Sequence, residues 1–242
     1  RLAPAAYLAL AASGLALVPW SGGFVPVAAS TGIVVWGAVE ALATVALFLQ
    51  GWAPNAPLAL LGAYRYTALG LSYILVSMFV LIAAALPAES LDLAAVVASQ
   101  GEAWNVLRQP LGLPLFLVAG LGVTFWGPLD FAQSRDLAGG VAAESAGPPL
   151  LLWSAARSAM LVAFAAVAAT VFLGGWQGPW LPGPLWLAVK TLLLLAVLVI
   201  LGRVLVRVAP ERFVGLAWLV LLPAAFAHLA WAGLLALPGG AG

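Results

Sequence analysis

One stretch of the chain, residues 127–147, is polar and contains Asp130, Arg135, Asp136 and Glu144. A carboxylate can accept strong hydrogen bonds from a basic partner, and it can also cap the first turn of a helix. Two interpretations therefore stand for Asp130, Asp136 and Glu144. They form a binding face for a partner, or they belong to a solvated loop and cap its helices.

Glu40 and Lys190 are ionisable residues inside long apolar stretches. Such a group is costly in a membrane unless it is paired or faces water, so it often marks an ion path. Glu40 could relay protons with a partner such as Tyr73, Lys190 or His228, or it could be a hydrogen-bonded structural acid. Lys190 could instead extend toward the membrane surface. For His228 we expect a buried hydrogen bond.

Two arginines lie inside apolar stretches, close to one end of each. Arg65 could bind an acid of residues 127–147, or it could extend to lipid phosphates. Arg157 lies about two helical turns into its stretch, which is deep for a residue that only marks the inner face. Arg157 could neutralise Glu144 or Asp136, or it could replace a lost acid–base pair with a static one.

The elements that must position these residues are membrane-spanning helices. The chain has 242 residues, of which 65% are hydrophobic and 7% are charged. Apolar stretches long enough to cross a hydrocarbon layer of about 30 Å recur seven times. They lie near Leu2–Pro19, Ala28–Gln50, Leu60–Leu86, Leu111–Trp126, Pro149–Gly174, Pro184–Val206 and Phe213–Leu237. The predicted fold is an all-α membrane protein, a bundle of about seven transmembrane helices forming one domain over residues 1–242.

One of these stretches, Pro149–Gly174, carries small residues at helical spacing. They are Ala156, Ala159, Ala163 and Ala166. Because small residues let apolar helices approach closely, this face is predicted to pack against another helix.

The basic residues predict the orientation. If the first span runs outward from the cytoplasm, most of them lie at or near the inner face: Arg1, Arg65, Arg135, Arg157, Arg203, Arg207 and Arg212. Because cytoplasmic loops are enriched in Lys and Arg, we expect residues 127–147 and 203–212 to be cytoplasmic. At the outer face, Glu89–Val97 could form a short amphipathic helix on the membrane surface.

Composition excludes several classes of site. The chain has no cysteine and one histidine, so disulfides, thiolate metal sites and iron–sulfur ligation are excluded and no metal site is expected. Nine Lys or Arg residues nearly balance eight Asp or Glu residues. With no basic run, nothing points to nucleic acid as a partner.

Four stretches carry a resemblance to one family. They are Gly51-Trp52-Ala53-Pro54-Asn55 with Arg65; Pro128-Leu129-Asp130-Phe131 with Asp136 and Glu144; Phe172-Leu173-Gly174-Gly175-Trp176 with Lys190; and Arg207 with Glu211 and Leu221-Leu222-Pro223. In order and spacing they resemble the H subunit of bacterial proton-pumping NADH–quinone oxidoreductase (complex I), the homologue of mitochondrial subunit 1. The resemblance covers essentially the whole chain.

The resemblance implies a multi-pass subunit of a respiratory complex in a bacterial inner membrane, at the junction of its membrane and peripheral arms. The partners would be the other membrane and peripheral subunits and the lipid bilayer. This chain would bind no cofactor of its own and would not be catalytic alone, although quinone could bind. The implied quinone or docking face consists of Arg65, Asp130, Asp136, Glu144 and Arg207. The implied proton-path candidates are Glu40, Tyr73 and Lys190.

Several acids of the family pattern are replaced. Ile74 and Val123 stand where glutamates are expected, and Arg157 stands where an acid is expected. The chain also begins where the family's second span is expected, so we expect either a trimmed chain or a divergent member that lacks the first span. These replacements favour a reduced proton-path function.

Two alternatives stay open within this picture. One is a degenerate scaffold subunit that only docks its neighbours, and the other is the membrane anchor of a related energy-converting, hydrogenase-like complex. A free-standing transporter would be expected to show inverted repeats around a midplane site, and the sequence has no visible internal repeat.

Overall fold

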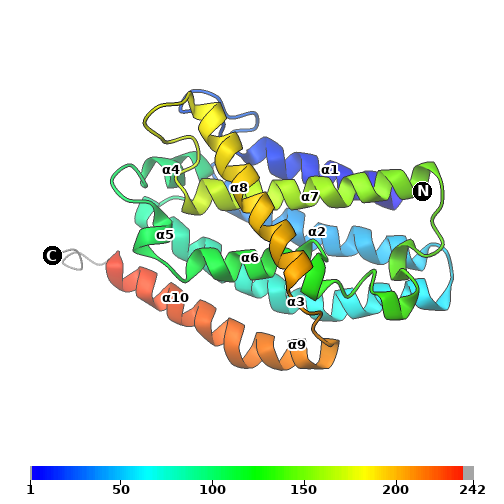
Figure 1. Cartoon of the computed structure of the whole chain (residues 1–242). Coiled ribbons are helices and arrows are strands. Elements are labelled where there is room, and N and C mark those ends of the chain that lie inside the picture. Colours follow the sequence, from blue (N-terminus) through cyan, green and yellow to red (C-terminus); the bar gives the residue numbers. More distant parts are fainter. Residues whose placement is uncertain (1, 237–242) are drawn as a thin grey trace.

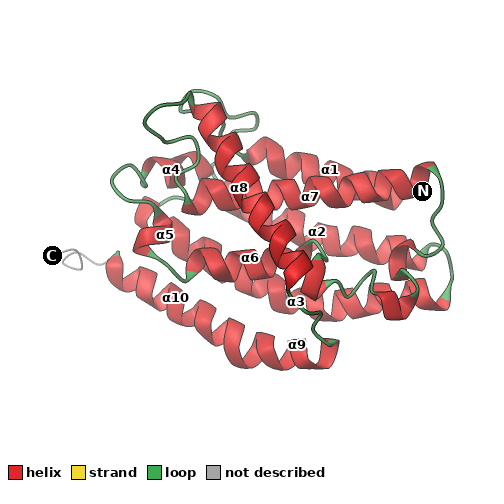
Figure 2. Cartoon of the chain, in the orientation of Figure 1, coloured by secondary structure: helices red, strands yellow, loops and turns green. Residues whose placement is uncertain are grey.

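The computed structural model describes residues 2–236, and this part of the chain contains helices and no strand (Figures 1 and 2). The helices are α1 (Leu2–Leu17), α2 (Gly32–Trp52), α3 (Pro57–Ala85), α4 (Leu93–Ala98), α5 (Asn105–Arg108), α6 (Gly112–Val123), α7 (Pro148–Phe172), α8 (Gly183–Val204), α9 (Pro210–Leu216) and α10 (Leu222–Leu235). Short turns of 3-10 or π helix are η1 (Leu86–Ala88), η2 (Gly127–Leu129), η3 (Arg135–Leu137), η4 (Gly140–Ala142) and η5 (Ala217–Leu221). Two predicted features, the inner-face position of Arg1 and the end of the last span at Leu237, lie outside the described residues.

Each of the seven predicted spans contains an apolar helix. Five helices are long and apolar enough to cross a membrane: α2, α3, α7, α8 and the continuous helix Pro210–Leu235, which comprises α9, η5 and α10. The other two, α1 and α6, are shorter. The chain is therefore a multi-pass membrane protein with the expected all-helical fold.

Helix α6 ends before its predicted boundary at Trp126. The backbone of Phe125 takes a φ of +42°, which lies far from the value of about −63° that a right-handed helix requires. The chain leaves the helix axis there and enters the polar residues that follow. Elsewhere, Pro in the first two positions of α3, α7, α8 and α9 helps to set where these helices begin.

Helix α7 is the most buried of the long spans, and it packs against α1 and α8. The small-residue face predicted for it is confirmed, since Ala156, Ala163 and Ala166 are buried and Ala159 is partly buried. The neighbouring α6 approaches so closely that a Cβ atom on Gly120 would lie 2.5 Å from the Phe164 ring. Small residues permit this close packing of apolar helices.

The outer surfaces of α8 and of the Pro210–Leu235 helix are apolar. Large exposed side chains on them include Leu192, Leu193, Leu219, Phe226 and Trp231. In Figure 1, α8 crosses obliquely over α7. Exposed apolar side chains on helices whose backbone hydrogen bonds are internal are what contact with lipid requires.

The two ends of the bundle differ. The polar loop, defined as residues 127–147, lies at one end, whereas α4 and α5 lie at the other (Figure 1). The amphipathic surface helix predicted for Glu89–Val97 is corrected here. The helix begins only at Leu93, after the Asp92 carboxylate accepts a 2.9 Å hydrogen bond from the Ala94 N–H. It packs against α7 and buries Leu93, Val96 and Val97, because its apolar residues face the bundle.

Candidate functional site

The polar loop is held in its shape by glycines. Gly140 has a φ of +53°, and a Cβ atom there would overlap the Ala132 carbonyl oxygen. The Val141 N–H donates a 3.0 Å hydrogen bond to that same oxygen. Only glycine, which has no Cβ, permits this turn. A further hydrogen bond of 3.0 Å, from the Val208 N–H to the Pro128 carbonyl, ties the loop to the α8–α9 turn.

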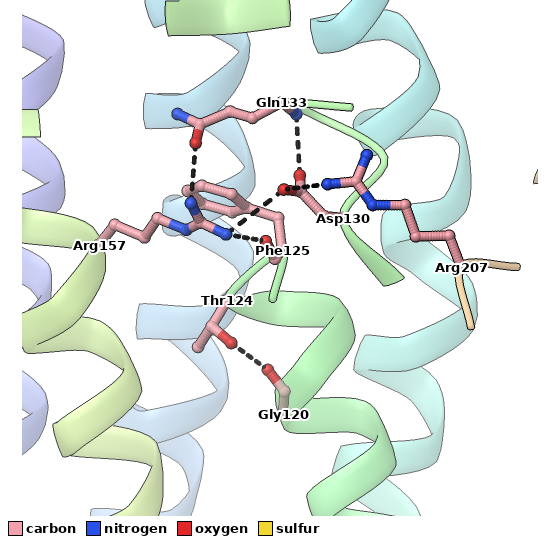
Figure 3. Close-up of polar contacts among 7 residues, drawn as sticks. All are labelled: Gly120, Thr124, Phe125, Asp130, Gln133, Arg157 and Arg207. Carbon is pink, nitrogen blue, oxygen red and sulfur yellow. Dashed lines mark hydrogen bonds and ion pairs between the residues drawn. The ribbon is translucent and has the colours of Figure 1, made fainter. Parts of the chain in front are cut away.

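Asp130 is the buried centre of the loop. Its carboxylate lies 3.4 Å from Arg157 and 3.9 Å from Arg207, and it accepts a 2.9 Å hydrogen bond from the Gln133 N–H (Figure 3). Burial raises the pKa of Asp130 above its ordinary value, and Arg157, the Gln133 N–H and Arg207 offset only part of this rise. One carboxylate therefore faces two guanidinium groups, and the group of three carries a net positive charge.

Arg157 is fixed from several sides. It donates hydrogen bonds of 2.9 Å to the Gln133 side-chain oxygen and 2.5 Å to the Phe125 carbonyl oxygen. Its guanidinium carbon also lies 4.7 Å from the ring centre of Phe125 and 4.7 Å from that of Trp126. Planar arginine groups stack on aromatic faces in this way. Arg157 thus joins α7 to the end of α6 and to the polar loop.

A third ion pair lies at the surface of the same loop. Arg65 of α3 donates a 2.5 Å hydrogen bond to Asp136, whose side chain is 58% exposed. The Ser134 hydroxyl and the Arg65 guanidinium lower the pKa of Asp136. The prediction that Arg65 binds an acid of this loop is confirmed.

A cleft of about 300 Å³ is lined both by the Arg65–Asp136 pair and by the Arg207–Asp130 pair. Its lining residues are Arg65, Asp130, Phe131, Ser134, Asp136, Arg207, Val208, Ala209 and Pro210. Of the five predicted face residues, the cleft brings together Arg65, Asp130, Asp136 and Arg207. Glu144 is exposed, and no ion pair joins it to any described residue.

The predicted partner of Arg157 was wrong. Arg157 pairs with Asp130, not with Asp136 or Glu144. Asp130 is buried at the end of α6, within reach of a side chain that lies deep in its span. Asp136 is exposed and already occupied by Arg65. The hydrogen bonds of Arg157 to the Gln133 side chain and to the Phe125 carbonyl were not predicted. The hydrogen bond from the Gln133 N–H to Asp130 was also missed, although aspartate side chains commonly accept such bonds from backbone N–H groups a few residues further on.

The interior acid Glu40 has a different partner from those predicted. It is fully buried on α2, and the Ser77 hydroxyl of α3 donates a 2.8 Å hydrogen bond to it. None of Tyr73, Lys190 and His228 forms a hydrogen bond with it. Tyr73 instead donates a 3.0 Å hydrogen bond to the Tyr66 carbonyl.

The interpretation that Lys190 extends toward the membrane surface is wrong, because its side chain is buried. Its ammonium group donates hydrogen bonds of 2.5 Å, 3.0 Å and 2.7 Å to the carbonyl oxygens of Leu173, Gly175 and Gln177. These carbonyls follow the end of α7, where a helix leaves acceptors without donors and its dipole favours a cation. His228 is buried, but the hydrogen bond predicted for it is not found at Nε2, which has no partner among the residues that the structure describes.

Comparison with known proteins addresses the family directly. A family model described as NADH dehydrogenase matches residues 1–233. The chain belongs to this family. The NADH-quinone oxidoreductase H subunit numbered 1 of Rhodopseudomonas palustris (strain HaA2) is 32% identical over 234 residues, which make up 96% of this chain and 73% of that protein.

Two other relatives agree. The H subunit numbered 1 of strain BisB5 is also 32% identical, with the same 96% and 73% coverage. The H subunit numbered 2 of strain ATCC BAA-98 / CGA009 is 31% identical over 234 residues, again 96% of this chain and 73% of that protein. The resemblance that the four motifs carry is therefore confirmed, and it extends over nearly the whole chain.

Proposed function

We propose that this chain is a membrane subunit of an NADH–quinone oxidoreductase-like complex in a bacterial inner membrane. Its polar loop docks a peripheral subunit at the junction of the two arms. The names of the relatives support the assembly. The grouping of charged residues at one end of an otherwise apolar bundle supports the docking face, since charge on a helical membrane protein marks where it meets water or a partner.

We further propose that the subunit carries protons weakly or not at all. The observation that carries this proposal is Arg157, a cation inside a span that is held by Asp130, Gln133 and the Phe125 carbonyl. A group fixed by so many contacts is suited to positioning, not to relaying protons. Proton transfer also needs titratable groups or water within hydrogen-bond reach, and Glu40 bonds only to Ser77 and its own helix among the described residues.

Quinone is a weaker fit to the loop cleft. Ligand pockets are usually lined mainly by apolar residues with a few polar groups that fix orientation. This cleft has two ion pairs in its walls, and its two arginines face carboxylates. The lining suits a charged side chain of a partner better than a neutral ring.

The assembly is tested by purifying the tagged chain from its host in mild detergent and identifying the chains that accompany it. We expect the subunits of an NADH–quinone oxidoreductase. Hydrogenase-like partners would favour the anchor alternative, and a stable single chain that transports ions in liposomes would contradict the proposal.

The docking role is tested by the paired variant Asp136→Asn, Glu144→Gln. Both changes remove exposed charge without burying any group, so the chain should fold normally. We expect less peripheral subunit to co-purify, with unchanged proton pumping per assembled complex. Glu211→Gln, which changes an exposed acid on α9 outside the polar loop, is the matched control. Normal assembly with lost quinone reduction or pumping would show that the acids act in the reaction and would rule out the docking role.

A further inference from the structure

Two adjoining cavities lie at the end of the bundle opposite the polar loop. Their volumes are about 570 Å³ and about 510 Å³, and both are lined by Leu86, Glu89 and Ala236. They lie where α3 ends at Ala85 and α10 ends at Leu235 (Figure 1). Two spans thus end beside the same space, which puts the cavities at the level where hydrocarbon gives way to lipid head groups.

The second cavity is lined by three hydrogen-bond acceptors that lack donors among the described residues. Glu89 and Glu102 are exposed acids, and no ion pair joins either of them to a described residue. Gln109 is fully buried. Its Nε2 donates a 3.1 Å hydrogen bond to the Ala83 carbonyl, which leaves the buried Oε1 without a partner. A buried acceptor without a donor is unfavourable, so this wall calls for a ligand that donates hydrogen bonds.

A positively charged side chain also lines this cavity. Arg108 lines it and donates a 2.9 Å hydrogen bond to the Ser99 carbonyl, which holds the guanidinium in place. The guanidinium has further N–H groups, and arginine is well suited to bind phosphate oxygens. Hydrogen-bond acceptors and a guanidinium group therefore line one cavity.

The remaining walls are apolar. Leu86, Trp231 and Leu235 line the second cavity, and Ile82 and Leu91 line the first. Trp231 is a typical residue for the membrane interface, and its indole N–H donates a 3.4 Å hydrogen bond to the Arg108 carbonyl. An amphipathic cavity at this depth suits a lipid better than a soluble metabolite.

We propose that this cavity binds a phospholipid whose head group carries a primary ammonium, as in phosphatidylethanolamine. A primary ammonium has three N–H donors, which match the two carboxylates and the Gln109 oxygen. The lipid phosphate lies beside Arg108, and the acyl chains follow the apolar walls. A choline head group has no N–H donor, and the two acids disfavour a lipid with net negative charge.

The experiment uses the chain purified in mild detergent with whatever subunits accompany it. Phosphatidylethanolamine, phosphatidylcholine and phosphatidylglycerol with identical acyl chains are added separately. Native mass spectrometry after detergent washing then counts the lipids that each sample retains. We expect phosphatidylethanolamine to be retained about tenfold better than the other two, as the loss of charge-assisted hydrogen bonds predicts.

The double variant Glu89→Gln, Glu102→Gln should lose this preference, while Glu211→Gln, an exposed change on α9 that lines neither cavity, should keep it. If the double variant does not fold, Glu102→Gln alone, which changes one exposed side chain, should lower retention in the same direction. Equal retention of phosphatidylcholine, a preference for phosphatidylglycerol, or an unchanged preference in the Glu102 variant would each overturn the proposal. None of these outcomes depends on which partner docks at the polar loop.

Discussion

The two aspartates Asp130 and Asp136 lie six positions apart in one loop, yet they occupy opposite environments. Asp130 is 8% exposed and faces two arginines at 3.4 Å and 3.9 Å. Asp136 has a side chain that is 58% exposed and a single arginine partner among the described residues. Burial raises the pKa of Asp130, whereas the Ser134 hydroxyl and Arg65 lower that of Asp136.

This difference indicates that Asp130 and Asp136 have different roles, one buried and structural and the other exposed at the surface. The Asp130 group joins the loop to α7 through Arg157 and to the α8–α9 turn through Arg207. Breaking a buried pair leaves an uncompensated charge, whereas an exposed pair contributes little to stability. Asp130 therefore holds the loop in place, whereas the exposed Arg65–Asp136 pair is the one available for the docking that we propose.

The largest expected effect is that of Asp130→Ala. The change leaves Arg157 and the Gln133 N–H without the carboxyl oxygens that accept their hydrogen bonds, so we expect the free energy of unfolding to fall by about 3 kcal/mol. Thermal unfolding of the purified assembly in detergent measures it. Glu144→Ala is the control, because it removes an exposed acid of the same loop that has no ion pair with a described residue. If the two variants lose equal stability, Asp130 does not hold the loop.

A double-mutant cycle gives the next largest effect. Asp130→Asn and Arg157→Met should each destabilise the protein, but the double variant should lose less than the sum by about 1–3 kcal/mol, because contacting residues are coupled. The same cycle between Asp136 and Arg157 should show no coupling. Additive effects for Asp130 and Arg157 would mean that their contact contributes nothing.

Asp136→Asn and Arg65→Ala should have smaller effects on stability, each below about 1 kcal/mol, because exposed pairs are screened by water. They should nevertheless weaken the retention of the peripheral subunit at high salt more than Asp130→Asn does. Co-purification over a salt series measures this. A loss of stability as large as that of Asp130→Ala would erase the distinction between the two aspartates.

Most of the fold follows from the sequence. The apolar stretches locate all seven helical segments because helices satisfy every backbone hydrogen bond within one segment, which a membrane requires. The boundaries were less exact. Helix α6 ends before Trp126 because Phe125 takes a positive φ. A run of apolar residues does not predict such a conformation at a phenylalanine.

The site could be predicted only in part. The sequence assigned Arg65 an acid of the polar loop, because both approach the same end of the bundle. The sequence did not predict that Arg157 pairs with Asp130. That pairing depends on the path of the backbone between the end of α6 and Asp130, which residue types do not specify. Lys190 was also missed as a partner of carbonyl groups. Its acceptors are backbone carbonyl groups after α7. Every residue has such a carbonyl, so residue types do not indicate which carbonyls accept a hydrogen bond.

The smallest expected effect concerns pH, and its sign separates the two aspartates. The pKa of an aspartate in an unfolded chain is about 3.9. Because the pKa of folded Asp136 lies below its ordinary value, its ionised form stabilises the folded protein above about pH 4, and this contribution is lost as the pH falls. The exposure of Asp136 keeps the effect small.

Asp130 should behave in the opposite way, because its pKa in the folded protein is raised. Its contribution is present below the unfolded pKa and is lost as the pH rises through the folded value. Acidification toward about pH 4 should therefore increase the stability of the unmodified protein relative to Asp130→Asn. Further acidification should reduce it relative to Asp136→Asn. Thermal unfolding of the three proteins across this range measures both trends. Trends of the same sign would mean that the two carboxylates share one environment, and the contrast between them would not hold.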